Sequence, residues 1–145
     1  MTHYAPLVVW IIVILGLGGQ FGSMNETSRF IRPLLEFLFP SALPETLTAL
    51  HGGIRKFAHF AEYAVLGVLA FRAFSLHSRR LWWAVVGGLV IAFTVASIDE
   101  FQQSFLPERT SSPYDVLIDL AGAVAAVILA ALFTSGTNKK QHQGF

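Results

Sequence analysis

The sequence predicts an all-α fold, a polytopic membrane bundle of about four transmembrane helices. Of its 145 residues, 54% are hydrophobic and only 13% are charged, and the mean hydropathy is +0.58. Soluble domains carry about a quarter charged residues. Long apolar runs also recur along the chain, and a helix of about 20 apolar residues crosses a hydrocarbon core of ~30 Å. We expect residues 1–145 to form a single membrane domain.

Four apolar segments are the expected spans, at about 5–22, 57–76, 81–98 and 116–134. Small residues recur at every fourth position in the last two of them, which predicts close helix packing in lipid. These residues are Ala84, Gly88, Ala92 and Ala96 in the third span and Gly122, Ala126 and Ala130 in the fourth.

The long first connection contains an amphipathic segment at 25–39, which Pro40 ends. Its apolar side consists of Phe30, Ile31, Leu34, Leu35 and Leu38. We expect this helix either to lie in the membrane interface of the first external loop or to pack over the mouth of the bundle. The triplet at 51–53, His-Gly-Gly, predicts a helix break, and the polar tail from Gly136 predicts disorder.

Composition and motifs exclude several classes of protein. The net charge is +1 and no nucleic-acid-binding motif occurs, so we expect no nucleic-acid partner. The chain has no cysteine, which excludes disulfides and thiolate chemistry. No Gly-x-Ser-x-Gly motif is present, so covalent catalysis at a serine has no support.

The charges around the predicted spans indicate an orientation. The second connection and the C-terminal tail are purely basic, with Arg79, Arg80, Lys139 and Lys140. All nine acidic residues lie in or beside the first and third connections. Basic connections favour the cytoplasmic side of a membrane, so we expect both termini to be cytoplasmic and the acidic face to be external.

Polar residues gather where the second span begins and the third span ends. The second span opens with Arg55, Lys56, His59, Glu62 and Tyr63, in which His59, Glu62 and Tyr63 share one helix face. The third ends with Asp99, Glu100 and Gln103. Basic residues at a helix N-terminus and acidic residues at a C-terminus oppose the helix dipole. This placement indicates that the charges pair with each other or with a ligand.

The fourth span begins with a capping pattern, in which Ser112 precedes Asp115 by three residues and Pro113 takes the first helical position. Asp119 lies one turn deeper, on the face of Asp115 and Gly122. A lone carboxylate there would be costly. We therefore expect Asp119 to be protonated, or paired with Arg109, Lys56, Arg55 or His59.

These three blocks resemble the VanZ-like family of bacterial membrane proteins over about residues 55–132. The matching blocks are Lys56-x-x-His59-x-x-Glu62-Tyr63, Asp99-Glu100-x-x-Gln103, and Arg109 with Ser112-x-x-Asp115-x-x-x-Asp119-x-x-Gly122. The family commonly has Asn where this chain has Asp119. The resemblance implies a multi-pass protein of the bacterial cytoplasmic (inner) membrane, acting in the cell envelope, with a link to resistance to the glycopeptide teicoplanin. It implies no established reaction.

We expect the external polar cluster to handle or modify an anionic membrane lipid or lipid-linked envelope precursor. The candidate substrate-binding residues are Arg55, Lys56, Arg109 and Ser112. The candidate catalytic residues are His59 and Glu100 as acid and base, with Asp99, Glu62, Tyr63, Gln103, Asp115 and Asp119 around them. The sequence leaves open whether the protein is an enzyme.

Two alternatives stay open. The same cluster could bind a lipid headgroup, an envelope precursor or an antibiotic without turnover. We assign no cofactor and no metal ligand; a divalent metal is a minor alternative, held by His59, Glu62, Glu100, Asp115 and Asp119. With only one histidine in that set, Mg²⁺ or Mn²⁺ would suit it better than Zn²⁺.

Transport has little support, because no charge lies at mid-bilayer. Protein partners are not indicated.

Overall fold

The computed structural model describes residues 3–18, 24–77, 80–106 and 113–142, with the backbone alone at 24–25, 113 and 136–142. Every regular element in these ranges is an α-helix. The helices are α1 (Ala5–Leu17), α2 (Met24–Leu38), α3 (Pro44–Ser75), α4 (Leu81–Gln103) and α5 (Pro113–His142). The predicted all-α class is confirmed.

Three of the helices are long and apolar enough to cross a membrane, over Pro44–Ser75, Leu81–Gln103 and Tyr114–Ser135. They cover the second, third and fourth expected spans, except for Leu76 at the end of the second. The first expected span corresponds to α1, which has 13 residues and is therefore ~20 Å long at 1.5 Å per residue. This is shorter than the hydrocarbon core, so α1 is an apolar helix of less than spanning length within the described residues.

The expected helix break at His51, Gly52 and Gly53 is wrong, because α3 runs without interruption from Pro44 to Ser75. A helical glycine costs about 1 kcal/mol relative to alanine, and tertiary packing outweighs that cost here. Leu47 and His51 are buried, and the His51 ring pairs with the Thr27 hydroxyl of α2 at 3.1 Å.

The end of the chain also differs from expectation. A disordered tail was expected from Gly136, but α5 continues to His142. The sequence from Gly136 to His142 contains no proline, so the backbone can continue the hydrogen-bonding pattern of the helix.

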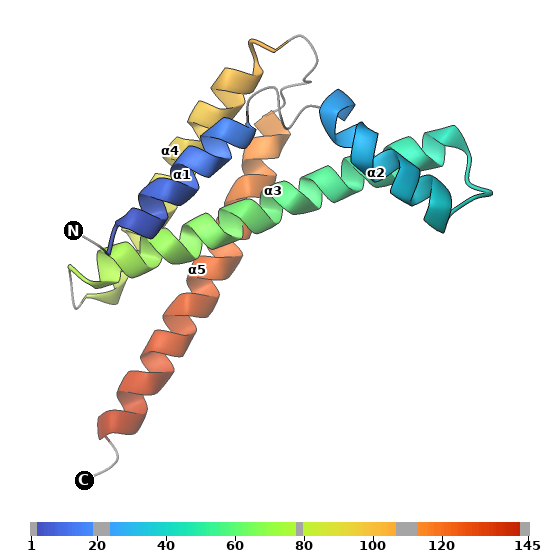
Figure 1. Cartoon of the computed structure of the whole chain (residues 1–145). Helices are drawn as coiled ribbons and strands as arrows, with labels where there is room; N and C mark the ends of the chain where they lie inside the picture. Colours follow the sequence, from blue (N-terminus) through green and yellow to red (C-terminus); the bar gives the residue numbers. More distant parts are fainter. Residues whose placement is uncertain (1–2, 19–23, 78–79, 107–112, 143–145) are drawn as a thin grey trace.

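The amphipathic segment forms α2, which is confirmed as a helix over nearly the expected residues. Figure 1 shows it lying against the N-terminal half of α3, away from α1 and α4. Leu35 is buried, whereas Phe30 and Phe37 are about four-fifths exposed at 80% and 81%. Most of the apolar side of α2 thus faces outward, as an interfacial helix requires.

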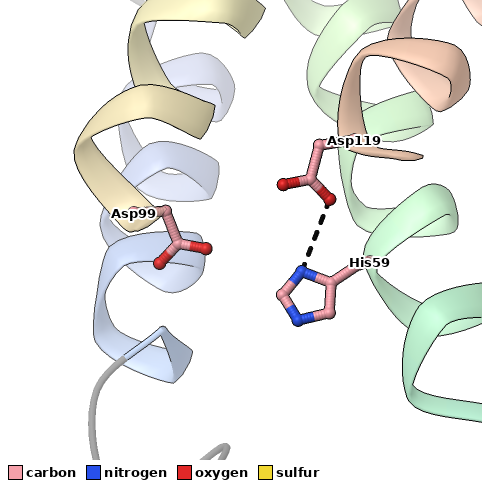
Figure 2. A group of neighbouring side chains, drawn as sticks. All are labelled: His59, Asp99 and Asp119. Atoms are coloured by element: carbon pink, nitrogen blue, oxygen red, sulfur yellow. Dashed lines mark ion pairs between the residues drawn. The ribbon is translucent and has the colours of Figure 1, made fainter. Parts of the chain in front are cut away.

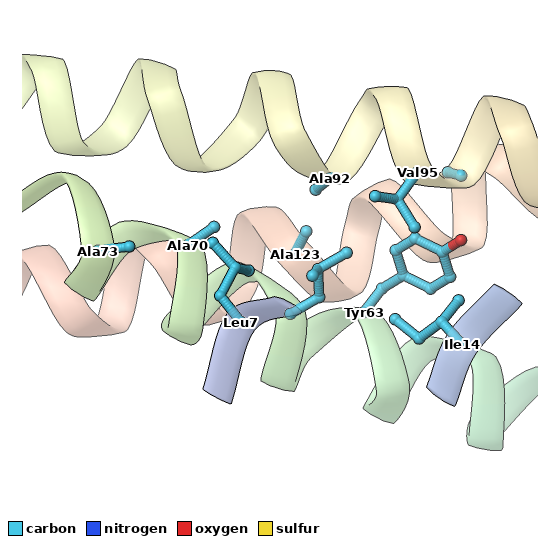
Figure 3. Packing of buried hydrophobic residues seen from close by; sticks show 10 residues of the cluster. Leu7, Ile14, Tyr63, Ala70, Ala73, Ala92, Val95 and Ala123 are labelled. Atoms are coloured by element: carbon cyan, nitrogen blue, oxygen red, sulfur yellow. The ribbon is translucent and has the colours of Figure 1, made fainter. Parts of the chain in front are cut away.

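The remaining helices form the bundle. In Figure 1, α1 lies alongside α4, and α5 crosses α3. Tyr4, just before α1, pairs through its hydroxyl with the His77 ring, just after α3. The beginning of α1 therefore lies beside the α3–α4 connection. The core joins residues of all four helices, among them Ile14, Tyr63, Val95 and Ala123 (Figure 3).

The core is built around close backbone contacts. A Cβ atom added to Gly122 would lie 2.1 Å from the Phe60 carbonyl oxygen, and one added to Gly67 would lie 2.9 Å from that of Ala123. The predicted small residues of α4 are all buried: Ala84, Gly88, Ala92 and Ala96. On α5, Gly122 is buried and Ala126 and Ala130 are half-buried. Glycine is required at 122 because the α3 backbone occupies the position of a side chain.

We predict that Gly122→Val separates α3 from α5 and lowers the melting temperature in detergent. Overpacking a core typically costs about 1–3 kcal/mol, and here the obstacle is backbone that cannot rotate away. The matched control is Gly53→Ala, because a Cβ atom at Gly53 would meet nothing within 4 Å. Gly53→Ala should leave stability unchanged or raise it by up to about 1 kcal/mol. Equal melting temperatures for the two variants would contradict this account of the packing.

Candidate functional site

A polar pocket lies between α3, α4 and α5, near the C-terminal end of α4 and the N-terminal end of α5. Its volume is about 150 Å³. It is lined by Gly52, Arg55, Lys56 and His59 of α3, Gln103 of α4, and Asp115 and Ile118 of α5. Five of these seven residues belong to the predicted site. The structure therefore brings residues from all three sequence blocks to one place.

The outer part of the pocket contains two cations and one carboxylate. Lys56 is exposed, while Arg55 and Asp115 are half-buried. Arg55 lies close enough to Asp115 for their opposite charges to interact. The Arg55 guanidinium has five N–H donors, which can serve several acceptors at once. These three side chains, which we call the outer layer of the site, have a net positive charge.

The inner layer of the site consists of His59 of α3, Asp99 of α4 and Asp119 of α5. Figure 2 shows the three side chains converging on a common space. The His59 Nδ1 atom lies 3.4 Å from the Asp119 Oδ1 atom. Asp99 and Asp119 are only 2% and 3% exposed. Of the expected partners of Asp119 that the structure describes, His59 is the one that forms an ion pair with it.

Asp99 is held in place by neighbours on two helices. The Gln103 side-chain amide donates a hydrogen bond of 2.8 Å to the Asp99 Oδ2 atom. Gly18, directly after α1, lies against the same carboxylate, because a Cβ atom added there would be 1.7 Å from Asp99 Oδ1. The end of α1 thus closes one side of the inner layer, a contribution that sequence reasoning missed.

Tyr63 lies one turn further along α3 than His59 and is fully buried at 0% exposure. Its hydroxyl has no hydrogen-bond partner among the described residues. The charges of Asp99 and Asp119 both act on it. The Tyr63 ring is therefore buried next to the site, and its hydroxyl lies close to the carboxylates of Asp99 and Asp119.

Five predicted site residues in the described ranges do not line the pocket: Tyr63, Asp99 and Asp119, placed above, and also Glu62 and Glu100. Glu62 and Glu100 are half-buried, and both act electrostatically on Tyr63. The backbone carbonyl of Glu62 accepts a hydrogen bond of 2.9 Å from the Trp10 indole of α1. The expected role of Glu100 beside His59 in proton transfer stays a prediction.

The dipole argument holds at only one of the two helix ends. Asp99 and Glu100 lie in the last turn of α4, where the dipole opposes their charge. Arg55 and Lys56, however, lie well inside α3, because that helix begins at Pro44. The dipole effect falls off within the first turn, so it does not bear on these two cations. Their grouping follows from the pocket instead.

Arg109 and Ser112, predicted to bind substrate, lie outside the described residues. α5 begins at Pro113 as the capping pattern predicted. Gly52 and Ile118 line the pocket but were not predicted. Gly52 precedes Arg55 by three residues and Lys56 by four, and Ile118 follows Asp115 by three. Residues at these spacings share a helix face, so the sequence could have identified both of them.

The fold and the site define a small polytopic helical membrane protein with a charged pocket at one end of its bundle. Residues 3–134 match the VanZ/LLP1 family, and the chain belongs to this family. The resemblance seen in the three sequence blocks is confirmed, and it extends through α1 and α2. Membership makes the chain a membrane protein of the cell envelope. No curated protein and no solved structure matches the chain.

We predict that Gln103→Glu destabilises the inner layer. The substitution removes the amide that donates to Asp99 and puts a second carboxylate against it, so the loss should be about 1–3 kcal/mol. The melting temperature in detergent at neutral pH measures this effect. Gln102→Glu is the matched control, because Gln102 is the neighbouring residue on α4 and is exposed. If both variants melt at the wild-type temperature, the hydrogen bond contributes nothing to stability.

Proposed function

We propose that this chain binds an anionic, lipid-linked substrate of the cell envelope in the pocket and handles or modifies it there. One observation supports this most directly. Two cations, Arg55 and Lys56, line the outer part of a pocket between apolar helices. A lipid headgroup can reach such a pocket while its chains stay in the bilayer. The family's association with teicoplanin resistance agrees with an envelope substrate.

The size and charge of the pocket suit a phosphate-bearing headgroup. A pocket volume of about 150 Å³ is well above the minimum of about 10–15 Å³ that a single water molecule needs on the same measure. Arginine binds phosphate through paired N–H donors, and lysine binds it as a point charge. Asp115 also lines the pocket, and its opposite charge acts on the Arg55 guanidinium, beside which an incoming anion would bind.

The pocket also contains one group suited to proton transfer. His59 lines the pocket and pairs with the buried Asp119. A carboxylate behind an imidazole fixes the orientation of the ring and stabilises its charged form. If the substrate is modified, His59 is the residue that we expect to donate or accept the proton.

A non-catalytic binder of a lipid headgroup, envelope precursor or antibiotic is the second candidate. One observation favours it: Glu100, the expected partner of His59 in acid–base chemistry, does not line the pocket. Among the described residues, the pocket then contains the two cations expected to bind the headgroup, Arg55 and Lys56, and only the His59 half of the expected acid–base pair.

We predict that Arg55→Gln and Lys56→Gln each weaken binding of an anionic lipid about tenfold. A hydrogen bond to a charged group contributes about 1.5–3 kcal/mol, and 1.4 kcal/mol corresponds to a factor of ten. Native mass spectrometry with phosphatidylglycerol, and with phosphatidylcholine of the same chains, measures the Kd values. Selective loss of phosphatidylglycerol binding is the expected result.

The control is Arg72→Gln, which removes an exposed arginine from the other end of α3. It should change the Kd less than twofold. Equal losses in all three variants would show that surface charge alone attracts the lipid. Mass analysis of lipid incubated with wild type and with His59→Ala separates the two candidate functions, because a product formed only by wild type requires turnover.

We further propose that the protein lies in the bacterial cytoplasmic membrane with both termini in the cytoplasm. Arg79, Arg80, Lys139 and Lys140 support this orientation, since basic connections favour the cytoplasmic side. The pocket would then open toward the external face, where lipid-linked envelope precursors are used.

Because the chain has no cysteine, single substitutions can report this orientation. We predict that Ser104→Cys reacts with a membrane-impermeant thiol reagent on intact cells, whereas His77→Cys reacts only after the cells are opened. Both positions are exposed, and they lie at opposite ends of α4. The reverse pattern of labelling would invert the orientation.

A further inference from the structure

The innermost polar side chains of the site come from three helices and converge on one point. His59, Asp99 and Asp119 each place a nitrogen or oxygen atom so that the three atoms lie within 4.8 Å of one another. In Figure 2 the two carboxyl groups and the imidazole face the same space. We propose that this triad binds a divalent transition-metal ion, Zn²⁺ or Mn²⁺, beneath the pocket.

The distance between His59 and Asp119 suits two ligands of one ion. The His59 Nδ1 and Asp119 Oδ1 atoms are 3.4 Å apart. A charge-assisted N–H···O hydrogen bond is shorter, at about 2.7–2.9 Å. Two ligands bound tetrahedrally at about 2.1 Å from a metal are separated by about 3.4 Å. The pair is therefore spaced as a ligand pair rather than as a tight hydrogen bond.

The charges of the inner layer also call for a cation. Asp99 and Asp119 are almost fully buried, and two carboxylates close together in an apolar interior repel each other and lack hydration. A protonated His59 supplies one positive charge against two negative ones. A divalent ion balances both carboxylates and leaves the imidazole neutral, the form in which it binds metals.

A second, independent observation comes from Tyr63. This side chain is fully buried, and its hydroxyl has no hydrogen-bond partner among the described residues. The charges of Asp99 and Asp119 act on this hydroxyl, as do those of Glu62 and Glu100, so it lies near the triad. Buried polar atoms nearly always have a partner, and an orphan indicates an ordered water or ion. A water on the metal would give the Tyr63 hydroxyl that partner.

The outer contacts of the triad resemble those that orient metal ligands. Gln103 donates a hydrogen bond of 2.8 Å to Asp99, which fixes the rotation of that carboxylate. Such supporting hydrogen bonds accompany ligands in most metal sites. The metal ligands differ from the set expected from the sequence, because Asp99 takes the place of Glu62, Glu100 and Asp115.

The ligand chemistry narrows the choice of ion. One imidazole and two carboxylates suit Zn²⁺ or Mn²⁺. Mg²⁺ loses its water reluctantly and keeps several water ligands, for which a buried triad offers little room. The proposal deepens the proposed function, since a cation behind Arg55 and Lys56 would draw an anion into the pocket, and it shares His59 with that pocket.

The test uses the full chain purified in detergent, treated with chelator, and then given ZnCl₂ or MnCl₂ alone. We expect about one ion per chain by mass spectrometry of the metal. We also expect the melting temperature to rise by about 5 °C or more at ion concentrations a hundredfold above the Kd. Asp119→Asn and His59→Gln should lose both effects. Mg²⁺ should produce neither.

Asp115→Asn is the matched control, because Asp115 lies one turn before Asp119 on α5 and outside the triad. It should keep the ion. A wild-type chain that binds neither ion, and holds a shared proton instead, overturns the proposal, as does full binding by Asp119→Asn. Metal binding without phosphatidylglycerol binding would overturn the proposed function alone, and the opposite result would overturn the metal site alone.

Discussion

The contact between the backbones of α3 and α5 is the constraint on which the site depends. Gly122 lies against the carbonyl of Phe60, and these residues are the near neighbours of Asp119 and His59. One helix turn on α5 and one peptide bond on α3 therefore separate the contact from the ion pair. In lipid, small residues permit such an approach because the apolar attraction between helices is weak. Any side chain at 122 would move the two polar groups apart.

The helical periodicity explains why much of the site was predictable. On α3, Arg55, His59 and Tyr63 follow one another at intervals of four residues, and Asp115 and Asp119 do the same on α5. Side chains at this spacing share a face, so each helix has a polar stripe readable from the sequence. The sequence does not, however, predict how each helix is rotated about its own axis relative to its neighbours. It follows from side-chain packing between helices, which sets the stripes against one another.

Asp99 and Glu100 illustrate this limit. The small residues Ala84, Gly88, Ala92 and Ala96 are spaced by four, and one more step leads to Glu100. An α-helix has 3.6 residues per turn, so each step of four advances the face by about 40°. Over four such steps, from residue 84 to residue 100, the row of small residues rotates away from the helix that it first contacts. The buried face of α4 therefore continues through Val95, Asp99 and Gln103 instead of Glu100. The structure therefore buries Asp99, whereas the sequence favoured Glu100 as the acid–base group.

The continuity of α3 through Gly52 and Gly53 could not be predicted from local propensity for a related reason. Two adjacent glycines, Gly52 and Gly53, normally indicate a break. The helix persists because α2 packs on Leu47 and His51, a contact between segments that are joined by a turn. The extra helical residues have a functional consequence: they place Arg55 and Lys56 on rigid helix instead of at a fraying end. Cations held in this way are preoriented for a ligand, which raises affinity by lowering the ordering cost.

The vertical order of charges couples the outer and inner layers of the site. Arg55 and Lys56 lie at the lip, His59 lies between the layers, and Asp99 and Asp119 lie beneath it. In the proposed two-ligand state, an anion beside Arg55 and Lys56 would attract a cation in the triad, and that cation would offset the negative charge of Asp99 and Asp119. Each ligand therefore improves the electrostatic environment of the other, and by linkage the effect is equal in both directions. The low dielectric of an apolar bundle strengthens this coupling over a separation of one helix turn. If both proposals hold, an ion in the buried triad strengthens the binding of an anionic lipid headgroup in the pocket.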